Sequence, residues 1–164
     1  MTFLNQKNMT KYLLTKDSVK IQFSNSIKII YFNNHSGKVF YRYKINTISN
    51  VKHPGIYIGK DKQGVDWFMH NHYETGKPAL ITRAEFAKGQ CLIHSPTSLN
   101  KSHLQIIESG LKQIINAKPY SELWYNCQHF VNIATRNENI SEDIKKWVGI
   151  SAASLFAFAI LGEL

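Results

Sequence analysis

Cysteine is scarce in this chain of 164 residues, which contains only Cys91 and Cys127. Two cysteines form neither the framework of a disulfide-rich domain nor a zinc site with four ligands of the usual spacing. The N-terminal segment, residues 1–18, also lacks the continuous apolar stretch of a secretory signal. We therefore expect a reducing, cytoplasmic setting in which both thiols stay reduced.

Repeats, low-complexity tracts and linkers rich in proline, glycine and serine are absent as well. The length matches one domain with a core of its own, so we assign residues 1–164 to a single domain. Acidic residues are outnumbered, and the formal net charge of +9 favours anionic partners such as a membrane surface or an acidic macromolecule. Because the lysines are scattered and no nucleic-acid-binding motif is present, nucleic acid is not the expected partner.

The first half of the chain has the pattern of short strands, in which β-branched and aromatic residues lie between turn residues. The turn residues Asn33–Gly37 predict a hairpin between two of these strands, and residues 60–64 predict another. Within residues 1–50 the sequence indicates strands but does not explain their place in the fold. The expected strands are residues 18–24, 26–32, 38–45, 55–59, 65–72, 79–82 and 90–94.

Helical patterns follow in the second half. Residues 100–118 place five aliphatic side chains on one helical stripe, and Pro119 ends it. Ser141, followed by two acidic residues, predicts the start of another helix. Strands followed by helices indicate an α+β domain. The aliphatic stripe consists of Leu104, Ile107, Leu111, Ile114 and Ile115.

The segment YNCQHFV places Cys127 in the first turn of a helix that we expect from the N-cap Asn126 to about Asn137. The positive end of a helix stabilises a thiolate, which is the reactive form of cysteine. His129 is poorly placed as a base, because two positions along a helix turn it some 200° away from the thiol. The alternative is that Cys127 is a small buried residue of the core, the common role of a cysteine in an apolar helix.

Better candidates for a base lie upstream. In HPGIYIG, alternation along a strand puts His53 on the same face as two glycines, which leave room beside it. In VDWFMHNH, His70 and His72 share a face, so this strand offers a second imidazole to orient His53. His70 and His72 also form an H-x-H pair that suits a metal ion, although a catalytic zinc needs a third protein ligand.

HPGIYIG, a following strand that ends in FMH, and YNCQHFV resemble, in this order, the lecithin:retinol acyltransferase-like proteins, a branch of the NlpC/P60 superfamily. The resemblance extends from His53 to about Lys146 and implies a circularly permuted papain-like fold, with an antiparallel sheet packed against helices. It also implies that Cys127 is the nucleophile, His53 the general base and His70 the residue that orients it, with no metal or cofactor. Gln128 stands where the family usually has glutamate, and the interval between the histidines is longer.

Residues 147–162 carry no charge and follow Lys145 and Lys146. As a helix they span ~24 Å at ~1.5 Å per residue, which is less than the ~30 Å of a hydrocarbon core. Two interpretations of this apolar C-terminal helix, within residues 147–164, remain open. It is either a buried helix of the domain or a tail that enters a membrane.

The sequence and the resemblance together predict a thiol acyl hydrolase or acyltransferase that works through an acyl-thioenzyme on lipid acyl groups. Phospholipid is one candidate substrate, and an anionic membrane surface is a candidate partner. Two alternatives stay open. One is a thiol peptidase or amidase with a protein or peptide substrate. The other is a binding module without catalysis, for lipid or an acidic partner.

Overall fold

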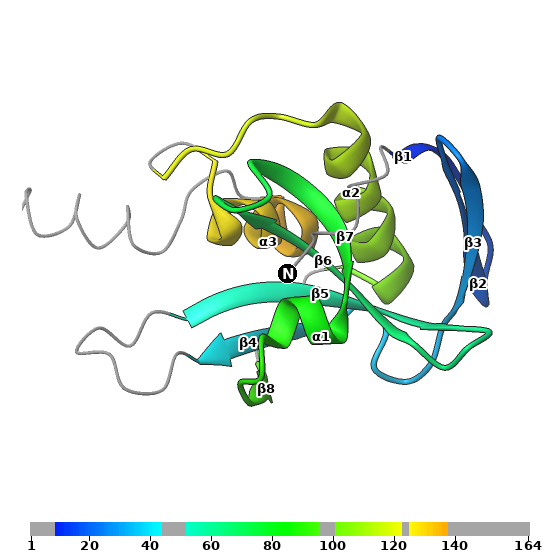
Figure 1. Ribbon diagram of the computed structural model, residues 1–164, viewed down its shortest axis with the longest axis horizontal. Coiled ribbons are helices and arrows are strands. Elements are labelled where there is room, and N and C mark those ends of the chain that lie inside the picture. The colour runs from blue at the N-terminus through cyan, green and yellow to red at the C-terminus, as the bar shows by residue number, and fades with distance from the viewer. Residues whose placement is uncertain (1–8, 44–51, 96–100, 123–124, 138–164) are drawn as a thin grey trace, which may run out of the picture.

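The computed structural model describes residues 9–43, 52–95, 101–122 and 125–137. The helix predicted from Ser141 and the apolar run 147–162 lie outside the described residues. The described chain forms eight strands and three helices in an α+β arrangement (Figure 1). The strands are β1 (Met9–Leu14), β2 (Ser18–Phe23), β3 (Ser26–Tyr31), β4 (Val39–Tyr43), β5 (Lys52–Asp61), β6 (Asp66–His72), β7 (Lys77–Thr82) and β8 (Leu92–His94). The helices are α1 (Arg83–Ala87), α2 (His103–Asn116) and α3 (Cys127–Arg136).

β5 is the longest strand and organises the antiparallel sheet. Ile56 pairs with Val39 of β4 and with Met69 of β6, so β4 and β6 lie on opposite edges of β5. Near its end, β5 pairs through Lys60 with Tyr31 of β3, on the edge that β4 also uses. β5 and β6 form the predicted hairpin across residues 60–64, and β7 continues the sheet beyond β6.

The hairpin predicted across Asn33–Gly37 is wrong. β3 and β4 are not paired with each other but follow one another along the same edge of β5, and each runs antiparallel to it. The turn residues behave as turn residues, since Ser36 N–H donates to the Asn33 carbonyl at 3.0 Å and Gly37 N–H donates to the Tyr57 carbonyl at 2.8 Å. They bend the chain without reversing it, because ten residues of β5 offer hydrogen-bonding groups to two strands in succession.

Two elements were not expected. Among the described strands β1 pairs only with β2, and its mixture of lysine, threonine and apolar residues gives no clear alternation. α1 has five residues, too few for a helical period. Its capping box does leave a signal in the sequence, because the Thr82 hydroxyl accepts from Glu85 N–H while the Glu85 carboxylate accepts from Thr82 N–H.

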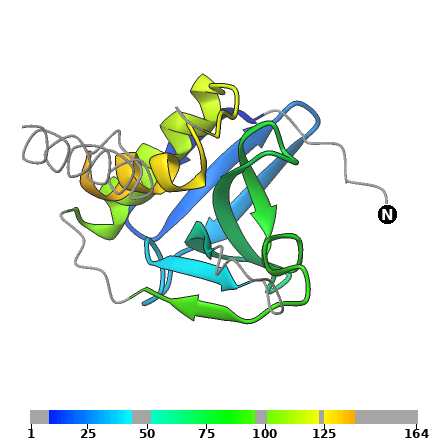
Figure 2. The same ribbon diagram turned by 90° about the vertical axis from the view of Figure 1, so that its left-hand side faces the viewer.

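The two faces of the β5–β6 hairpin are covered by different helices (Figure 1). Ile56, Ile58 and Met69 point into the main core, which α2 and α3 close with Ile107, Leu111 and Phe130, all of them fully buried. The three-stranded unit β1–β3 joins this core and lies beside α2 (Figure 2). On the other face, a smaller cluster of Tyr57, Phe68, Ala79 and Ile81 is capped by Phe86 of α1.

The two predicted helices that lie within the described residues, α2 and α3, are present with small changes. α2 covers the expected region and buries Ile107, Leu111 and Ile114, whereas Ile115 is 39% exposed because it lies at the edge of the buried stripe. In α3, Phe130, Val131 and Ala134 face inward. The packing of three helices on an antiparallel sheet confirms the coarse fold class that the sequence indicates.

Candidate active site

Cys127 is the first residue of α3 and is half-buried. Asn126 is the N-cap, as predicted: its side-chain oxygen accepts from the backbone N–H of Gln128 at 2.9 Å and from that of His129 at 3.1 Å. His129 is buried and turned back onto Asn126, with Nδ1 3.0 Å from Asn126 Oδ1, so it takes part in the helix cap. The sulfur therefore stands at the positive end of a ten-residue helix.

His53 and His70 form a buried imidazole pair. Nε2 of His53 lies 3.0 Å from Nδ1 of His70, and each residue is only 5% exposed. They come from neighbouring strands, β5 and β6, and share the face capped by Phe86, whose ring centroid is 5.6 Å from that of His53. His72 lies on the same face, with its ring centroid 4.5 Å from that of His53. The contact expected between His53 and His70 is present.

Gly55 explains how bulky rings fit beside these histidines. A Cβ atom at this position would lie 2.6 Å from Cε2 of Phe86, closer than real Cβ atoms approach a neighbour. The missing side chain therefore lets the Phe86 ring lie directly on β5, next to His53. Phe86 in turn stacks on Phe68 at a centroid distance of 4.7 Å. The histidine pair thus packs against the stacked rings of Phe86 and Phe68.

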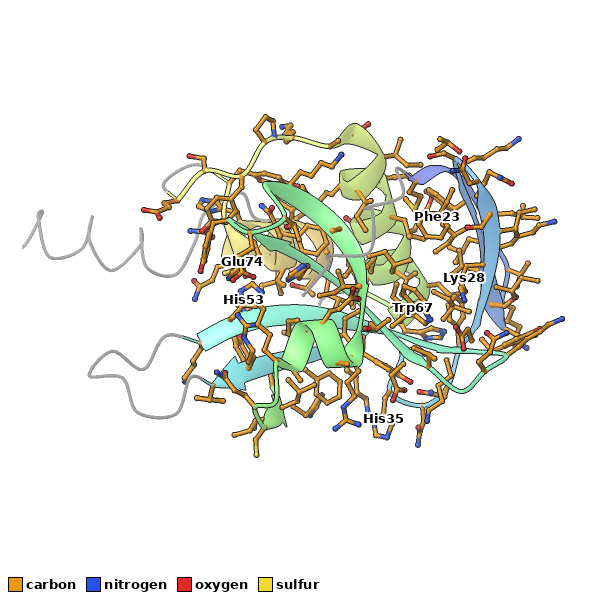
Figure 3. The ribbon with its side chains drawn as sticks, in the orientation of Figure 1. Phe23, Lys28, His35, His53, Trp67 and Glu74 are labelled. Atoms are coloured by element: carbon orange, nitrogen blue, oxygen red, sulfur yellow. The ribbon has the colours of Figure 1, made fainter. Side chains whose placement is uncertain are left out.

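The first turn of α3 is tied to the histidine strand. The Asn71 side-chain amide donates to the carbonyl of Tyr125, two residues before Cys127, at 2.8 Å. Asn71 is fully buried between His70 and His72 in sequence, on the opposite face of β6. Figure 3 shows His53 at the beginning of β5, below the N-terminal turn of α3. The described structure therefore brings the cysteine helix to the end of the sheet at which the histidines lie.

Arg42 is a member of the site that the sequence did not reveal. It pairs with His53 across β4 and β5, so both side chains lie on one face of the sheet. One guanidinium N–H donates to the carbonyl of Phe86 at 3.0 Å. Burial lowers the pKa of Arg42, and negative charge on Glu74, Tyr73 and Cys127 partly restores it. Only its strand position opposite His53 could have marked it, and that depends on a pairing that cannot be read from the sequence.

The three histidines are held in the neutral form. Burial lowers the pKa of His53 far below the usual histidine value, and the neighbouring positive charges act in the same direction. Burial, with the charges of His72, Arg42 and Lys88, lowers the pKa of His70 to about 3. The pKa of His72 falls to about 4 for the same reasons, although Glu74 opposes the shift. At neutral pH each ring therefore keeps a lone pair that accepts a proton or a hydrogen bond.

The protein should become less stable below about pH 6.5, because protonation of these histidines favours the unfolded chain. Between about pH 6.5, the unfolded value, and pH 5, the unfolded chain binds protons at His53 and His70 that the folded chain does not bind. The free energy of unfolding should therefore decrease as the pH is lowered, by at most about 1.4 kcal/mol per pH unit for each histidine. Urea titrations at pH 7, 6 and 5 measure this slope. His35→Asn, at an exposed position, should keep the slope, and a flat profile in both proteins would contradict the buried neutral pair.

Cys91 and the pair His70 and His72 are the other positions for which the sequence offered alternatives. Cys91 lies just before β8 and is exposed, rather than within a strand as expected. Its exposure means that access alone does not distinguish the two thiols. The carboxylate of Glu74 lies 3.5 Å from Nδ1 of His72 and also pairs with Lys88. In the described parts of the chain, no group of three or more His, Cys, Asp or Glu side chains is arranged to hold a metal ion.

Comparison with known proteins gives no match: no family model, no curated protein and no solved structure is significantly similar to the chain. Among the described residues, no helix is long and apolar enough to cross a membrane.

Proposed function

We propose that the protein is a cysteine-dependent acyl hydrolase or acyltransferase with a circularly permuted papain-like fold, acting on lipid acyl groups. The observation that carries this proposal is the buried hydrogen bond between His53 and His70 at the end of the sheet to which α3 brings Cys127. A nucleophile, a base and a residue that orients the base are the parts that thiol catalysis requires. The order of the elements, with the histidine strands before the cysteine helix, is that of the permuted arrangement.

The imidazole pair supports one assignment of roles. A base must present an unprotonated nitrogen to the thiol, so His53 carries its proton on Nε2 and donates it to Nδ1 of His70. Nδ1 of His53, on the other side of the ring, is then the nitrogen that accepts a proton. His70 fixes the tautomer and orientation of His53, as the third member of a catalytic triad does.

The reaction follows from these roles. The Cys127 sulfur attacks the carbonyl carbon of an ester, amide or thioester, and its proton passes to Nδ1 of His53. The bond to the leaving group breaks as that group takes the proton, which leaves a thioester on Cys127. Water or an acceptor alcohol or amine then attacks the thioester and gives its proton to His53, which releases the acyl product and the thiol. The positive end of α3 stabilises the negative oxygen in both steps.

A lipid substrate fits the charge of the protein. Its formal net charge of +9 favours attachment to anionic membranes, where acyl esters are concentrated. At the site itself, Arg42 and Lys88 are the cations whose charge acts on all three histidines. We therefore propose an anionic membrane surface, with phospholipid as the acyl donor.

Trapping of the acyl-thioenzyme tests the proposal. Incubation with a short-chain nitrophenyl ester or a diacyl phospholipid, followed by acid quenching and mass spectrometry of peptides, should give a thioester on Cys127. Cys91→Ser is the matched control and should acylate to the same extent. Acylation of Cys91 alone, or no Cys127 adduct from any ester, thioester or peptide ester, would refute a catalytic Cys127. An adduct from peptide esters but not from lipids would favour the peptidase alternative.

A further inference from the structure

The cations around the candidate site differ in their partners. Lys88, at the C-terminal end of α1, forms an ion pair with Glu74. Arg42 forms no ion pair with a described carboxylate, and its one described hydrogen bond is to the carbonyl of Phe86. A half-buried guanidinium beside three histidines is costly unless negative charge compensates it. Of the described carboxylates, Glu74 acts on the charge of Arg42, but Glu74 is itself paired with Lys88, so Arg42 is compensated only in part.

The histidines do not provide the positive charge that a thiolate needs. In a thiolate–imidazolium pair, the base holds the proton that the cysteine has lost. Here burial and the charges of Arg42 and Lys88 disfavour the imidazolium form of His53. The positive charges of Arg42 and Lys88 also favour an anion beside His53. A thiolate next to His53 is therefore stabilised by a cation other than His53.

We propose that Arg42 is the counter-ion of the Cys127 thiolate, so that the nucleophile rests as an arginine–thiolate pair. This inference rests on the proposed function and specifies how its nucleophile is activated. Arg42 lies on the histidine face of the sheet, opposite His53 in the β4–β5 register, and is anchored at Phe86. Its charge interacts with that of Cys127.

Other charged groups around the thiol oppose Arg42 only weakly. Glu74 and Tyr73 lie on the β6–β7 turn, and Glu74 is neutralised by Lys88. Tyr120, in the segment before α3, has a pKa that burial and the charges of Cys127, Glu122 and Tyr73 raise, so it stays neutral. Glu122 is exposed, which weakens its effect through solvent screening. Among these described groups, Arg42 is therefore the cation to which the proposal assigns stabilisation of the thiolate.

The arginine–thiolate pair changes the timing of proton transfer. In this form of the proposed mechanism, the thiol proton passes to solvent before the substrate binds instead of to Nδ1 of His53 during the attack. The thiolate then attacks without help from a base. The leaving group takes its proton from water, or leaves as an anion when it is a nitrophenolate. His53 then works in the second half of the reaction, where it accepts the proton of the attacking water or alcohol.

The pH dependence of thiol alkylation tests this pair. In a Cys91→Ser background only Cys127 reacts, and its rate with iodoacetamide from pH 5 to 9 reports its thiolate fraction. The apparent thiol pKa should lie below the ordinary value of about 8.5. Arg42→Gln should move it towards that value, which lowers the rate at pH 6.5 about tenfold for each unit of the shift. Arg42→Lys keeps the charge and should retain most of the rate, and His53→Ala should change the rate less than about twofold.

The opposite pattern would overturn the proposal. If His53→Ala abolishes the low thiol pKa and Arg42→Gln leaves it intact, the imidazolium is the counter-ion. An ordinary pKa in the unsubstituted thiol would overturn it as well. If Arg42→Gln disturbed the fold, it would also lower the melting temperature and change the near-ultraviolet circular dichroism spectrum. Arg42→Lys, which keeps the charge, is the matched control. If Arg42→Gln raises the thiol pKa as expected but no substrate gives an acyl adduct on Cys127, Arg42 is the counter-ion of the thiolate and the proposed function is refuted.

Discussion

His53→Ala is expected to accumulate the acyl-thioenzyme instead of turning it over. With the Cys127 thiolate paired to Arg42 as proposed above, attack needs no base. A nitrophenyl leaving group departs as an anion and needs no proton, so Cys127 is still acylated. The second step lacks the base that activates water, and steady-state turnover should fall by about 10²- to 10⁴-fold. A stopped-flow burst of nitrophenolate near one equivalent, with a lasting thioester in the mass spectrum, measures this result.

His35→Ala is the matched control, since His35 is exposed on the turn between β3 and β4. It should turn over the ester at the normal rate without a lasting adduct. If His53→Ala hydrolyses the thioester as fast as the unsubstituted protein, His53 is not the base. His72, the other imidazole in contact with His53, then becomes the residue to replace.

Gly59→Ala is expected to have the largest effect on stability. A Cβ atom on Gly59 would lie 2.0 Å from the carbonyl oxygen of Tyr31, a backbone atom that moves only if β3 moves. β3 pairs with β5 through just Ile30–Asp61 and Tyr31–Lys60, so a shift of β3 would disturb all of the pairing between these two strands. Overpacking against backbone should lower the free energy of unfolding by about 3 kcal/mol. Chemical denaturation followed by circular dichroism measures the loss.

Gly110→Ala provides the comparison. Its Cβ atom would meet the side-chain end of Met69, at 2.6 Å from Cε, and a methionine side chain can move aside. Within α2 the change from glycine to alanine also favours the helix by up to about 1 kcal/mol. The two effects should nearly cancel. A Gly59→Ala variant as stable as Gly110→Ala would show that β3 and β5 are not in close contact.

The parts of the site that could be predicted are those with local signals. Asn126 as N-cap and the shared face of His70 and His72 follow from spacing along a single helix or strand. The meeting of His53 with His70 also depends only on the hairpin of β5 and β6, whose turn contains glycine. Local rules of spacing were therefore sufficient for the imidazole pair.

The features that were missed or mistaken depend on distant pairing. Asn33–Gly37 has the composition of a hairpin turn, yet the length of β5 decides that β3 and β4 share one edge. Arg42 reaches the site because β4 lies beside the beginning of β5, which no pattern within VFYRY indicates. In α2, Ile115 belongs to the apolar stripe but is partly exposed, since the position of the helix on the sheet sets the edge of the core.

The two halves of the candidate site differ in how far apart their parts lie along the chain. The hydrogen bond between His53 and His70 joins residues 17 positions apart, within one hairpin. The bond from Asn71 to Tyr125, which holds the start of α3, spans 54 positions. Closing the longer loop costs more chain entropy, and that contact is lost more readily when the chain opens. We therefore expect the imidazole pair to form before α3 docks, so that the proposed active site is completed only by that docking.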